Sequence, residues 1–349
     1  FLLFLPMLSN WNVLCWNIRG MNSDPNLLAL SNAIATSGCS FICLQETKNT
    51  AFDNSYIKSC CPKRSDKFAF IPSRGASGGI LTLWNSAIFT GTVLIEEEFA
   101  LVTKFQSTQS AQMWTLVNIY GPCQGDSRMD YTSWLLNLNI PSNEDWLLVG
   151  DFNYIRSPTN RNKPGGNIND MITFNDFIRT QGLIELPLKG RTFTWSNMQE
   201  DPLLEQLDWF FTSTNWTNTY PNTIVKPLSK PVFDHIPCVI SIETNIPRSN
   251  LFRFESYWIQ HPGLMDLVTA SWNKHVPSDN YATIISRKLK ALRYALKNWS
   301  KKISKLASAI ANSNSALADL DSLENKRNLT IQERNFRRIL KNHLLRLLE

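Results

Sequence analysis

The stretch WLLVGDFN, residues 146–153, joins an apolar segment to a glycine and two polar side chains. Four consecutive apolar residues, Trp146 to Val149, predict a buried strand. Asp151 and Asn153 follow this strand through Gly150. Ligand-binding and catalytic groups gather at strand ends, on loops that a rigid sheet holds in place. The stretch therefore predicts both a sheet and a functional site at its edge.

Polar residues stand beside five further predicted strands in the same way. They are Asn17 in 12–18, Gln45 and Glu46 after 41–45, Tyr120 ending 114–120, Asp208 after 203–204, and Asp234 with His235 before 236–240. Carboxylates with few cysteine or histidine partners favour Mg²⁺ or Mn²⁺ over zinc. A histidine flanked by aspartate suits proton transfer or charge stabilisation, and the set predicts metal-assisted phosphoester hydrolysis. A P-loop kinase or ATPase is disfavoured because the GxxxxGK[ST] motif is absent.

Short strands alternate with a few helices from residue 11 to about residue 244. Further strands are predicted at 80–84, 93–95, 101–105 and 192–195, and helices at 24–38, 131–138 and 170–182. This mixed α/β pattern is rich in strands and lacks the regular βαβ rhythm of a Rossmann sheet.

Length and composition limit the class of protein. The 349 residues allow about two domains, and 43% apolar with 18% charged residues excludes a disordered chain. The sequence contains no run of 18 apolar residues, so it predicts no transmembrane helix. The seven cysteines form no CxxC pair, which favours reduced thiols in an intracellular protein, nuclear or cytoplasmic. The apolar residues 1–8 lack a basic region and a starting methionine, which suggests a fragment without a signal peptide.

The pattern changes beyond Pro247, so we place a domain boundary near 246–256, between domains at 11–246 and 251–349. Apolar residues from Ile285 to Ile310 follow a heptad spacing that predicts a helical hairpin or coiled coil, with possible self-association through 285–310. A second helix should begin at Thr330, with Glu333 completing a capping box, after a looser polar connection at 311–316. Residues 251–349 carry 17 Lys and Arg against 8 Asp and Glu. We therefore expect residues 281–349 to be separable helices that strengthen binding to a polyanionic partner, although a basic face can also be merely solvated.

Six short motifs in order carry a family resemblance: NIRG (17–20), QET (45–47), NIYGP (118–122), GDFN (150–153), LDWF (207–210) and DHIP (234–237). Their order and spacing resemble the endonuclease/exonuclease/phosphatase superfamily. Residues 150–167 and 182–197 look like the endonuclease of plant LINE-type non-LTR retrotransposons. The tail with FRFESYW (252–258) resembles the linker before their reverse transcriptase, and no Asp-Asp pair of a polymerase occurs.

The resemblance implies a fold of two packed mixed β-sheets flanked by helices, a four-layer αββα sandwich, followed by a helical C-terminal extension. It also implies roles for the strand-end residues. Glu46 would bind Mg²⁺ or Mn²⁺, helped by Asn17 and Asp234. Asp151 would activate water, Asn153 would hold water and phosphate, Tyr120 would donate to the phosphate, and His235, oriented by Asp208, would stabilise phosphoryl charge. Substitution of Asp151 or His235 should then abolish nicking with little loss of fold.

Each assignment has a structural alternative. Glu46 could pair with Lys48, Asp151 and Asn153 could be turn residues, and Asp208 could be an exposed carboxylate. Tyr120 could pack in a turn, Asn17 could cap one, and His235 could pair with Asp234. Two departures from the family pattern, Phe233 before the Asp-His pair and Gln206 before Leu-Asp, suggest a degraded copy.

Two glycine-containing basic loops, one with Arg161 and Lys163 and one with Arg74, could hold DNA phosphates or be ordinary turns. The leading hypothesis is a metal-dependent DNA endonuclease that nicks its target to leave a 3′-hydroxyl primer. One alternative is an abasic-site repair nuclease on the same fold. The other is a catalytically degraded remnant that only binds nucleic acid.

Overall fold

The computed structural model describes residues 11–348 except 62–64, 76, 124, 126, 142, 230–232, 243–253, 255–257, 260, 278–279 and 304. The apolar start at 1–8 and most of the predicted boundary at 246–256 lie outside this description, as do the side chains of 301–308. None of the described helices is long and apolar enough to cross a membrane.

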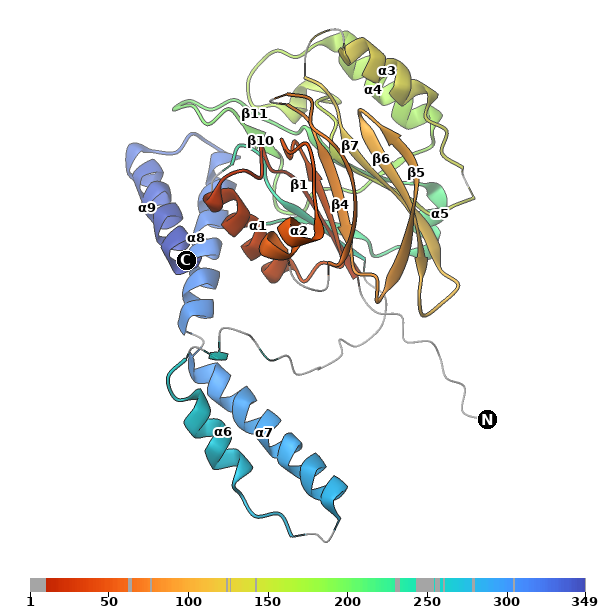
Figure 1. The fold of residues 1–349 in the computed structure, drawn as a ribbon. Coiled ribbons are helices and arrows are strands. Elements are labelled where there is room, and N and C mark those ends of the chain that lie inside the picture. Colours follow the sequence, from red (N-terminus) through yellow and green to blue (C-terminus); the bar gives the residue numbers. More distant parts are fainter. Residues whose placement is uncertain are drawn as a thin grey trace. The chain divides into compact units, whose positions relative to one another are not determined.

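Two six-stranded sheets form the centre of the molecule (Figure 1). The first, in the order β13-β14-β1-β2-β4-β3, comprises β1 (Trp11–Asn17), β2 (Phe41–Gln45), β3 (Lys67–Ile71), β4 (Ile80–Trp84), β13 (Ile224–Pro227) and β14 (Cys238–Ile242). The second, β5-β6-β7-β8-β12-β9, comprises β5 (Phe89–Glu97), β6 (Ala100–Ser107), β7 (Met113–Tyr120), β8 (Trp146–Asp151), β9 (Ile184–Glu185) and β12 (Asp208–Thr212). Strands β1 and β2 pair in parallel, as do β7 and β8.

Side-chain alternation explains why the sheets pack face to face. Val13 of β1 and Leu147 of β8 belong to the buried cluster between the sheets, whereas Leu14 and Leu148 belong to clusters on the outer faces. Successive side chains of a strand point to opposite faces, so a strand apolar at every position must be covered on both sides. Each of the two sheets is therefore an inner layer.

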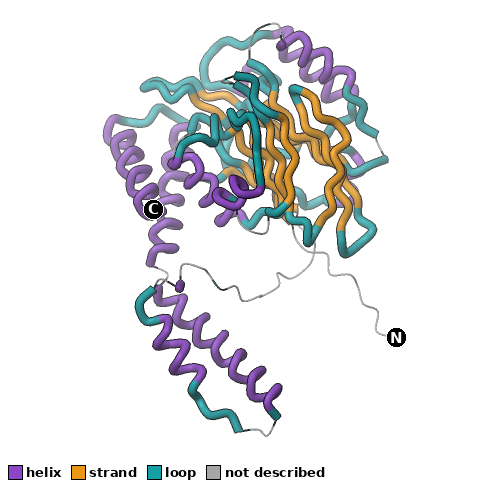
Figure 2. The backbone as a smooth tube through the Cα atoms, in the orientation of Figure 1, coloured by secondary structure: helices purple, strands orange, loops and turns teal. Residues whose placement is uncertain are grey.

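Helices cover the two outer faces (Figure 2). Buried residues of α1 (Asp24–Ser37) and α2 (Asn54–Cys60) pack on the first sheet, and those of α3 (Ser127–Asn137) and α4 (Ile168–Thr180) pack on the second. The short α5 (Thr214–Thr219) contacts β8. These four layers confirm the predicted αββα sandwich.

The segment predicted as a strand at 192–195 forms only β10 (Trp195–Ser196), which pairs with β11 (Leu204–Glu205) in a small separate sheet. The backbone before it bends away from the ladder. Thr194 is fully buried there, and its hydroxyl oxygen accepts from the N–H groups of Leu207 and Asp208, both at 3.0 Å. The Thr194 side chain therefore holds a neighbouring loop, and residues 192–194 do not join a strand as expected.

The C-terminal helices divide differently from the predicted extension at 251–349. The described residues of Pro247–Asn312 form one compact unit, and those of Ser313–Glu349 belong to the same unit as residues up to 246. The helices are α6 (Leu264–Trp272), α7 (Tyr281–Ile303), α8 (Lys305–Glu324) and α9 (Ile331–Leu348). The predicted heptad stretch 285–310 is divided between α7 and α8. The looser connection expected at 311–316 is wrong, because these residues continue α8.

Within the smaller unit, the middle of the heptad seam packs inside the chain. Leu292, Leu296 and Trp299 of α7 cluster with Leu264 and Leu267 of α6. The first half of the seam, from Ile285 to Leu289, is exposed. The apolar stripe is therefore covered in part by the chain itself.

Within the larger unit, α8 and α9 are tied to the sandwich. Asp321 of α8 pairs with Arg191 at 2.8 Å, and both side chains are buried. Arg337 of α9 pairs with the same carboxylate at 3.1 Å. The predicted capping box of α9 is present, with Thr330 and Glu333 exchanging hydrogen bonds of 2.8 and 3.2 Å.

Candidate active site

One end of the space between the sheets is polar. On the faces that point between the sheets, most side chains are apolar in β1, β2, β7, β8 and β12. At the polar end, the same faces of these strands carry Asn17, Gln45, Tyr120, Asp151 and Asp208. Parallel pairing sets Asn17 opposite Gln45 and Tyr120 opposite Asp151, and antiparallel pairing sets Asp208 opposite Asp151. The strand-end residues predicted from the sequence therefore meet.

Gly150 allows this meeting by its lack of a side chain. Its φ is +141°, and a Cβ placed there would lie 2.0 Å from the carbonyl oxygen of Ile119 on the neighbouring strand. Any other residue would push β8 away from β7, and with it the Asp151 carboxylate.

Asp151 is the centre of the hydrogen-bond network and is 1% exposed. Its Oδ2 accepts from the amide of Asn17 at 2.8 Å and from the amide of Asn153 at 3.2 Å, and its Oδ1 accepts from the Asn153 N–H at 3.0 Å. Burial raises the pKa of Asp151, as does the negative charge of Asp208, while His235 opposes the rise. A carboxyl group with a raised pKa can take a proton from water near neutral pH.

His235 lies between two carboxylates and is 2% exposed. Its Nδ1 is 2.9 Å from Asp208 Oδ2, and its Nε2 is 3.5 Å from Asp151 Oδ2. Burial lowers the pKa of His235, but Asp208 and Asp151 raise it more, to about 9. The imidazole is therefore protonated at neutral pH. Its expected contact with Asp208 is present, and the alternative of an exposed Asp208 is wrong, since that residue is 2% exposed.

A second group of charges adjoins the first. Glu46 Oε2 accepts from Asn17 at 3.3 Å, and Glu46 Oε1 lies 3.5 Å from Arg19 and 3.2 Å from Lys48. Arg19 also contacts Asp234 Oδ2 at 2.7 Å. The guanidinium thus bridges Glu46 and Asp234, which are the two carboxylates expected to bind metal. The expected alternative pair of Glu46 with Lys48 is also present.

The backbone at this site is strained. Five described residues other than glycine have positive φ, and Arg19, Glu46, Lys48 and Asn153 are four of them, at 52° to 57°. Non-glycine residues in this region cost free energy and cluster at functional sites. The strain aims the side chains of three different loops at one point.

Asn17 acts as a donor in this arrangement. Its amide nitrogen points to Glu46 and Asp151, while its Oδ1 accepts from the Arg19 N–H at 3.1 Å. The amide nitrogen of Asn17 therefore orients the two carboxylates. Its oxygen accepts one hydrogen bond and keeps a second lone pair, so the metal role of Asn17 stays a prediction.

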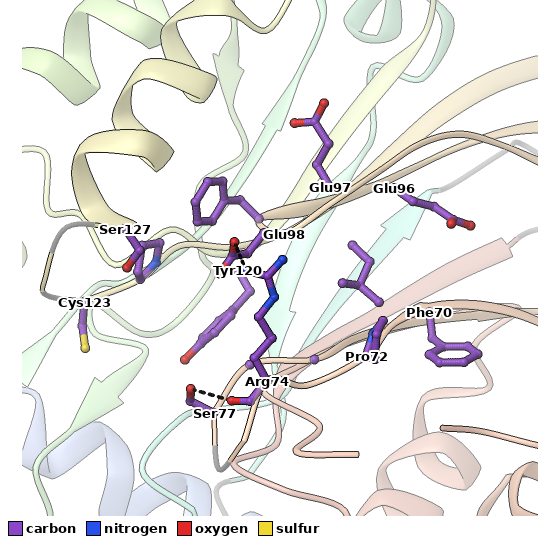
Figure 3. A pocket seen from close by; sticks show the side chains of 15 residues that line it. Phe70, Pro72, Arg74, Ser77, Glu96, Glu97, Glu98, Tyr120, Cys123 and Ser127 are labelled. Atoms are coloured by element: carbon purple, nitrogen blue, oxygen red, sulfur yellow. Dashed lines mark hydrogen bonds and ion pairs between the residues drawn. The ribbon is translucent and has the colours of Figure 1, made fainter. Parts of the chain in front are cut away.

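Tyr120 lines a pocket of about 460 Å³ next to this network (Figure 3). Burial raises its pKa well above the ordinary value, and the charges of Glu46 and Asp151 raise it further. The phenol is therefore a hydrogen-bond donor at any physiological pH. Arg74 points into the same pocket and pairs with Glu98 at 2.8 Å.

The other predicted phosphate-binding residues also have carboxylate partners. Arg161 pairs with Glu205 at 3.3 Å, and its side chain is 13% exposed. Lys163 contacts Asp201 at 2.6 Å. Neither side chain joins the network around Asp151.

Both departures from the family pattern are accommodated. Phe233 is buried and packs edge-on against Trp16, with ring centroids 5.1 Å apart. Gln206 accepts from the Asn160 amide at 3.0 Å. His235 and Asp208 remain hydrogen-bonded beside these residues, at 2.9 Å.

The sequence reasoning missed Arg19, Thr194 and Trp195. Trp195 donates from Nε1 to Asp234 Oδ2 at 3.0 Å, and Thr194 anchors the backbone of Asp208. NIRG and TFTW contain all three, but only the three-dimensional structure shows their partners.

The oxygen-rich donor set suits a hard divalent cation. Ligand atoms of Asp151, Asp208 and His235 lie within 4.8 Å of one another and form a candidate metal cluster. Both ring nitrogens of His235 face carboxylates of this cluster. Glu46 and Asp234, the two carboxylates expected to bind metal, offer further oxygen ligands, and their charges are balanced by Arg19 and Lys48.

Comparisons with known proteins agree with this architecture. AP endonuclease LMAP from Leishmania major superposes with a TM-score of 0.51 at 16% identity, covering 68% of this chain and 88% of that one. An AP endonuclease from Archaeoglobus fulgidus gives 0.52 at 12% identity, covering 67% and 100%. The endonuclease domain of TRAS1, a telomere-specific non-LTR retrotransposon, gives 0.51 at 14%, covering 67% and 99%. These low identities show a shared fold only.

No curated protein matches the sequence significantly. A sequence profile of the Endonuclease/Exonuclease/phosphatase family matches residues 14–280. This match covers most of the chain, including every residue of the Asp151 network. The chain therefore belongs to the Endonuclease/Exonuclease/phosphatase family.

Proposed function

We propose that this protein is a divalent-metal-dependent DNA endonuclease that hydrolyses one phosphodiester bond of a duplex and leaves a 3′-hydroxyl primer. The observation that carries the proposal is the continuous network from Glu46 through Asn17 and Asp151 to His235 and Asp208. It places a candidate base beside a cationic imidazole and an oxygen-rich cation site, as metal-assisted phosphoryl transfer requires.

Asp151 takes the proton of the attacking water, and Asn153 holds the carboxylate in place through its N–H and its amide. Protonated His235, held by Asp208, faces the same point through Nε2 and stabilises the negative charge that grows on the phosphoryl oxygens. The Tyr120 phenol donates a hydrogen bond to the phosphate. Glu46 and Asp234 would hold Mg²⁺ or Mn²⁺, which would polarise the phosphoryl oxygen and neutralise its charge.

The motifs at 150–167 and 182–197, which resemble plant LINE-type endonucleases, support a retrotransposon role. The likeness to the TRAS1 endonuclease domain is compatible with it. An abasic-site nuclease is the second candidate, because AP endonucleases superpose with similar scores. The test is nicking of supercoiled plasmid in Mg²⁺, with Asp151→Ala as the inactive control. Equal rates on plain and abasic duplexes support the first candidate, and a large preference for the abasic duplex supports the second.

A further inference from the structure

A second pocket, of about 370 Å³, lies between α9 and the loop that follows β10. Loop residues 196–202 form one wall, and α9 together with the end of α8 forms the other. All of these residues belong to the larger unit. The charged side chains that line the pocket are Glu200, Glu324, Arg334, Arg337, Arg338 and Lys341.

Cations outnumber carboxylates in this pocket by four to two. Arg334 pairs with Glu200 at 3.0 Å, and Arg337 pairs with Glu324 at 2.8 Å. Arg338 and Lys341 have neither an ion pair nor a hydrogen bond from their side chains to any described residue. Burial lowers the pKa of Lys341 to about 8, and Arg337 lowers it too, while the charges of Asp321 and Glu324 oppose the fall without forming an ion pair. The two unpaired cations therefore favour an anion.

The pocket is fixed in shape before any ligand arrives. Asn328, in the turn before α9, donates to Asp201 of the loop at 2.8 Å. Arg334 also donates to the backbone carbonyl of Glu200 at 2.7 Å. The loop is thus held against the start of α9, next to the helical turns that carry Arg338 and Lys341.

The same loop is joined to the candidate active site. The Ser196 N–H donates to the backbone oxygen of Asp234 at 3.0 Å, and Trp195 forms a bridge with His235. The pocket is therefore lined by the same loop that contacts Asp234 and His235. A nucleic-acid strand bound at the candidate active site can continue along this loop to the pocket.

We propose that the pocket between α9 and loop 196–202 binds a backbone phosphate of the nucleic-acid substrate through Arg338 and Lys341. The proposal rests on the proposed function for the identity of the ligand. Arginine offers a planar fork that fits a phosphate with two hydrogen bonds, and lysine adds a point charge. The pocket reads no bases, so it contributes affinity and register along the strand.

The test replaces both unpaired cations in the full chain, as the double variant Arg338→Gln with Lys341→Gln. Parent and variant both carry Asp151→Ala, and the buffer contains no divalent metal, so that only binding is measured. The matched control, Lys326→Gln with Arg346→Gln, removes two exposed charges of the same region that do not line the pocket. Binding of a fluorescent 30-base-pair duplex is measured by anisotropy between 50 and 300 mM salt. The expected result is about 5- to 20-fold weaker binding, with a log–log salt slope reduced by about 1 to 2, because each phosphate contact contributes about 0.9. The control retains the parent slope.

Arg338→Gln alone guards against a folding defect, because this side chain is exposed and should still reduce the slope by about 1. Shortening the duplex on one side of the nick should abolish the difference between parent and variant. Salt slopes equal to the parent in both variants would overturn the proposal even if the parent binds and nicks DNA. Loss of inorganic phosphate binding with unchanged DNA binding would also overturn it, since the pocket would then hold only a free anion. If the parent nicks no plasmid yet the variants lower the slope, the proposed function fails and the phosphate site stands.

Discussion

Replacing Asp208 with asparagine tests how the protein keeps His235 charged. Asp208 Oδ2 lies 2.9 Å from the imidazole and is the carboxylate that raises the pKa of His235 most. The substitution preserves shape but removes the charge. An opposite charge at this distance is worth about 1 to 3 pH units, so the pKa of His235 should fall from about 9 to between about 6 and 8.

The raised pKa of His235 should also make the free energy of unfolding depend on pH. The pKa of His235 is raised above its unfolded value of 6.5, so the stabilisation is complete below pH 6.5 and is lost as pH rises through about 9. The difference corresponds to about 3 kcal/mol at 1.36 kcal/mol per pH unit. In Asp208→Asn this alkaline loss of unfolding free energy should shrink to about 2 kcal/mol or vanish.

The assay is an NMR titration of the imidazole signals, with His235 identified by its absence in His235→Asn. Asp234→Asn is the control, because Asp234 contributes least among the neighbouring carboxylates and should lower the pKa far less. The alkaline limb of the nicking rate should move to lower pH by the same amount as the pKa. A His235 pKa that stays near 9 in Asp208→Asn would refute the reasoning.

Substitutions at four residues probe the site further. Arg19→Ala removes the cation between Glu46 and Asp234, the two carboxylates proposed to bind metal. It should tighten Mn²⁺ binding, measured by electron paramagnetic resonance, about 5- to 30-fold, or about 1–2 kcal/mol for this part-exposed charge; unchanged affinity would show that the guanidinium does not compete with metal. Asp151→Asn should lower the nicking rate about 100- to 10,000-fold with a nearly unchanged melting temperature. His235→Ala, contrary to the expectation from sequence, should cost about 3–5 kcal/mol of unfolding free energy, because it leaves buried carboxylates unpaired. Equal melting temperatures for these two variants would contradict this. Thr194→Val should lower the free energy of unfolding by about 1–3 kcal/mol, measured by denaturant unfolding, because it removes the acceptor for the buried N–H groups of Leu207 and Asp208. Thr194→Ser keeps the hydroxyl and should restore the stability.

The strand-end residues could be predicted from the sequence because period-two alternation and strand boundaries are local signals. Once β8 is recognised, Asp151 must face the same side as Leu147 and Val149, and the sheet brings it to Asp208. The role of Arg19 could not be predicted, because it depends on a left-handed backbone that no local pattern specifies. The docking of α9 was missed for a different reason. An amphipathic basic helix has a recognisable period, yet its sequence does not name the surface that covers it, and Arg191 lies 130 residues from Asp321.

The division of the chain has a consequence for folding during synthesis. Because residues 247–312 are interposed between two parts of one unit, the sandwich leaves the ribosome well before the helices that complete it. At about 5–20 residues per second, residues 250–349 take about 5–20 s. During that interval Arg191 lacks Asp321, and loop 196–202 lacks its contacts with Asn328 and Arg334. The nascent sandwich should therefore be open to proteases and chaperones at this edge until α8 and α9 close it.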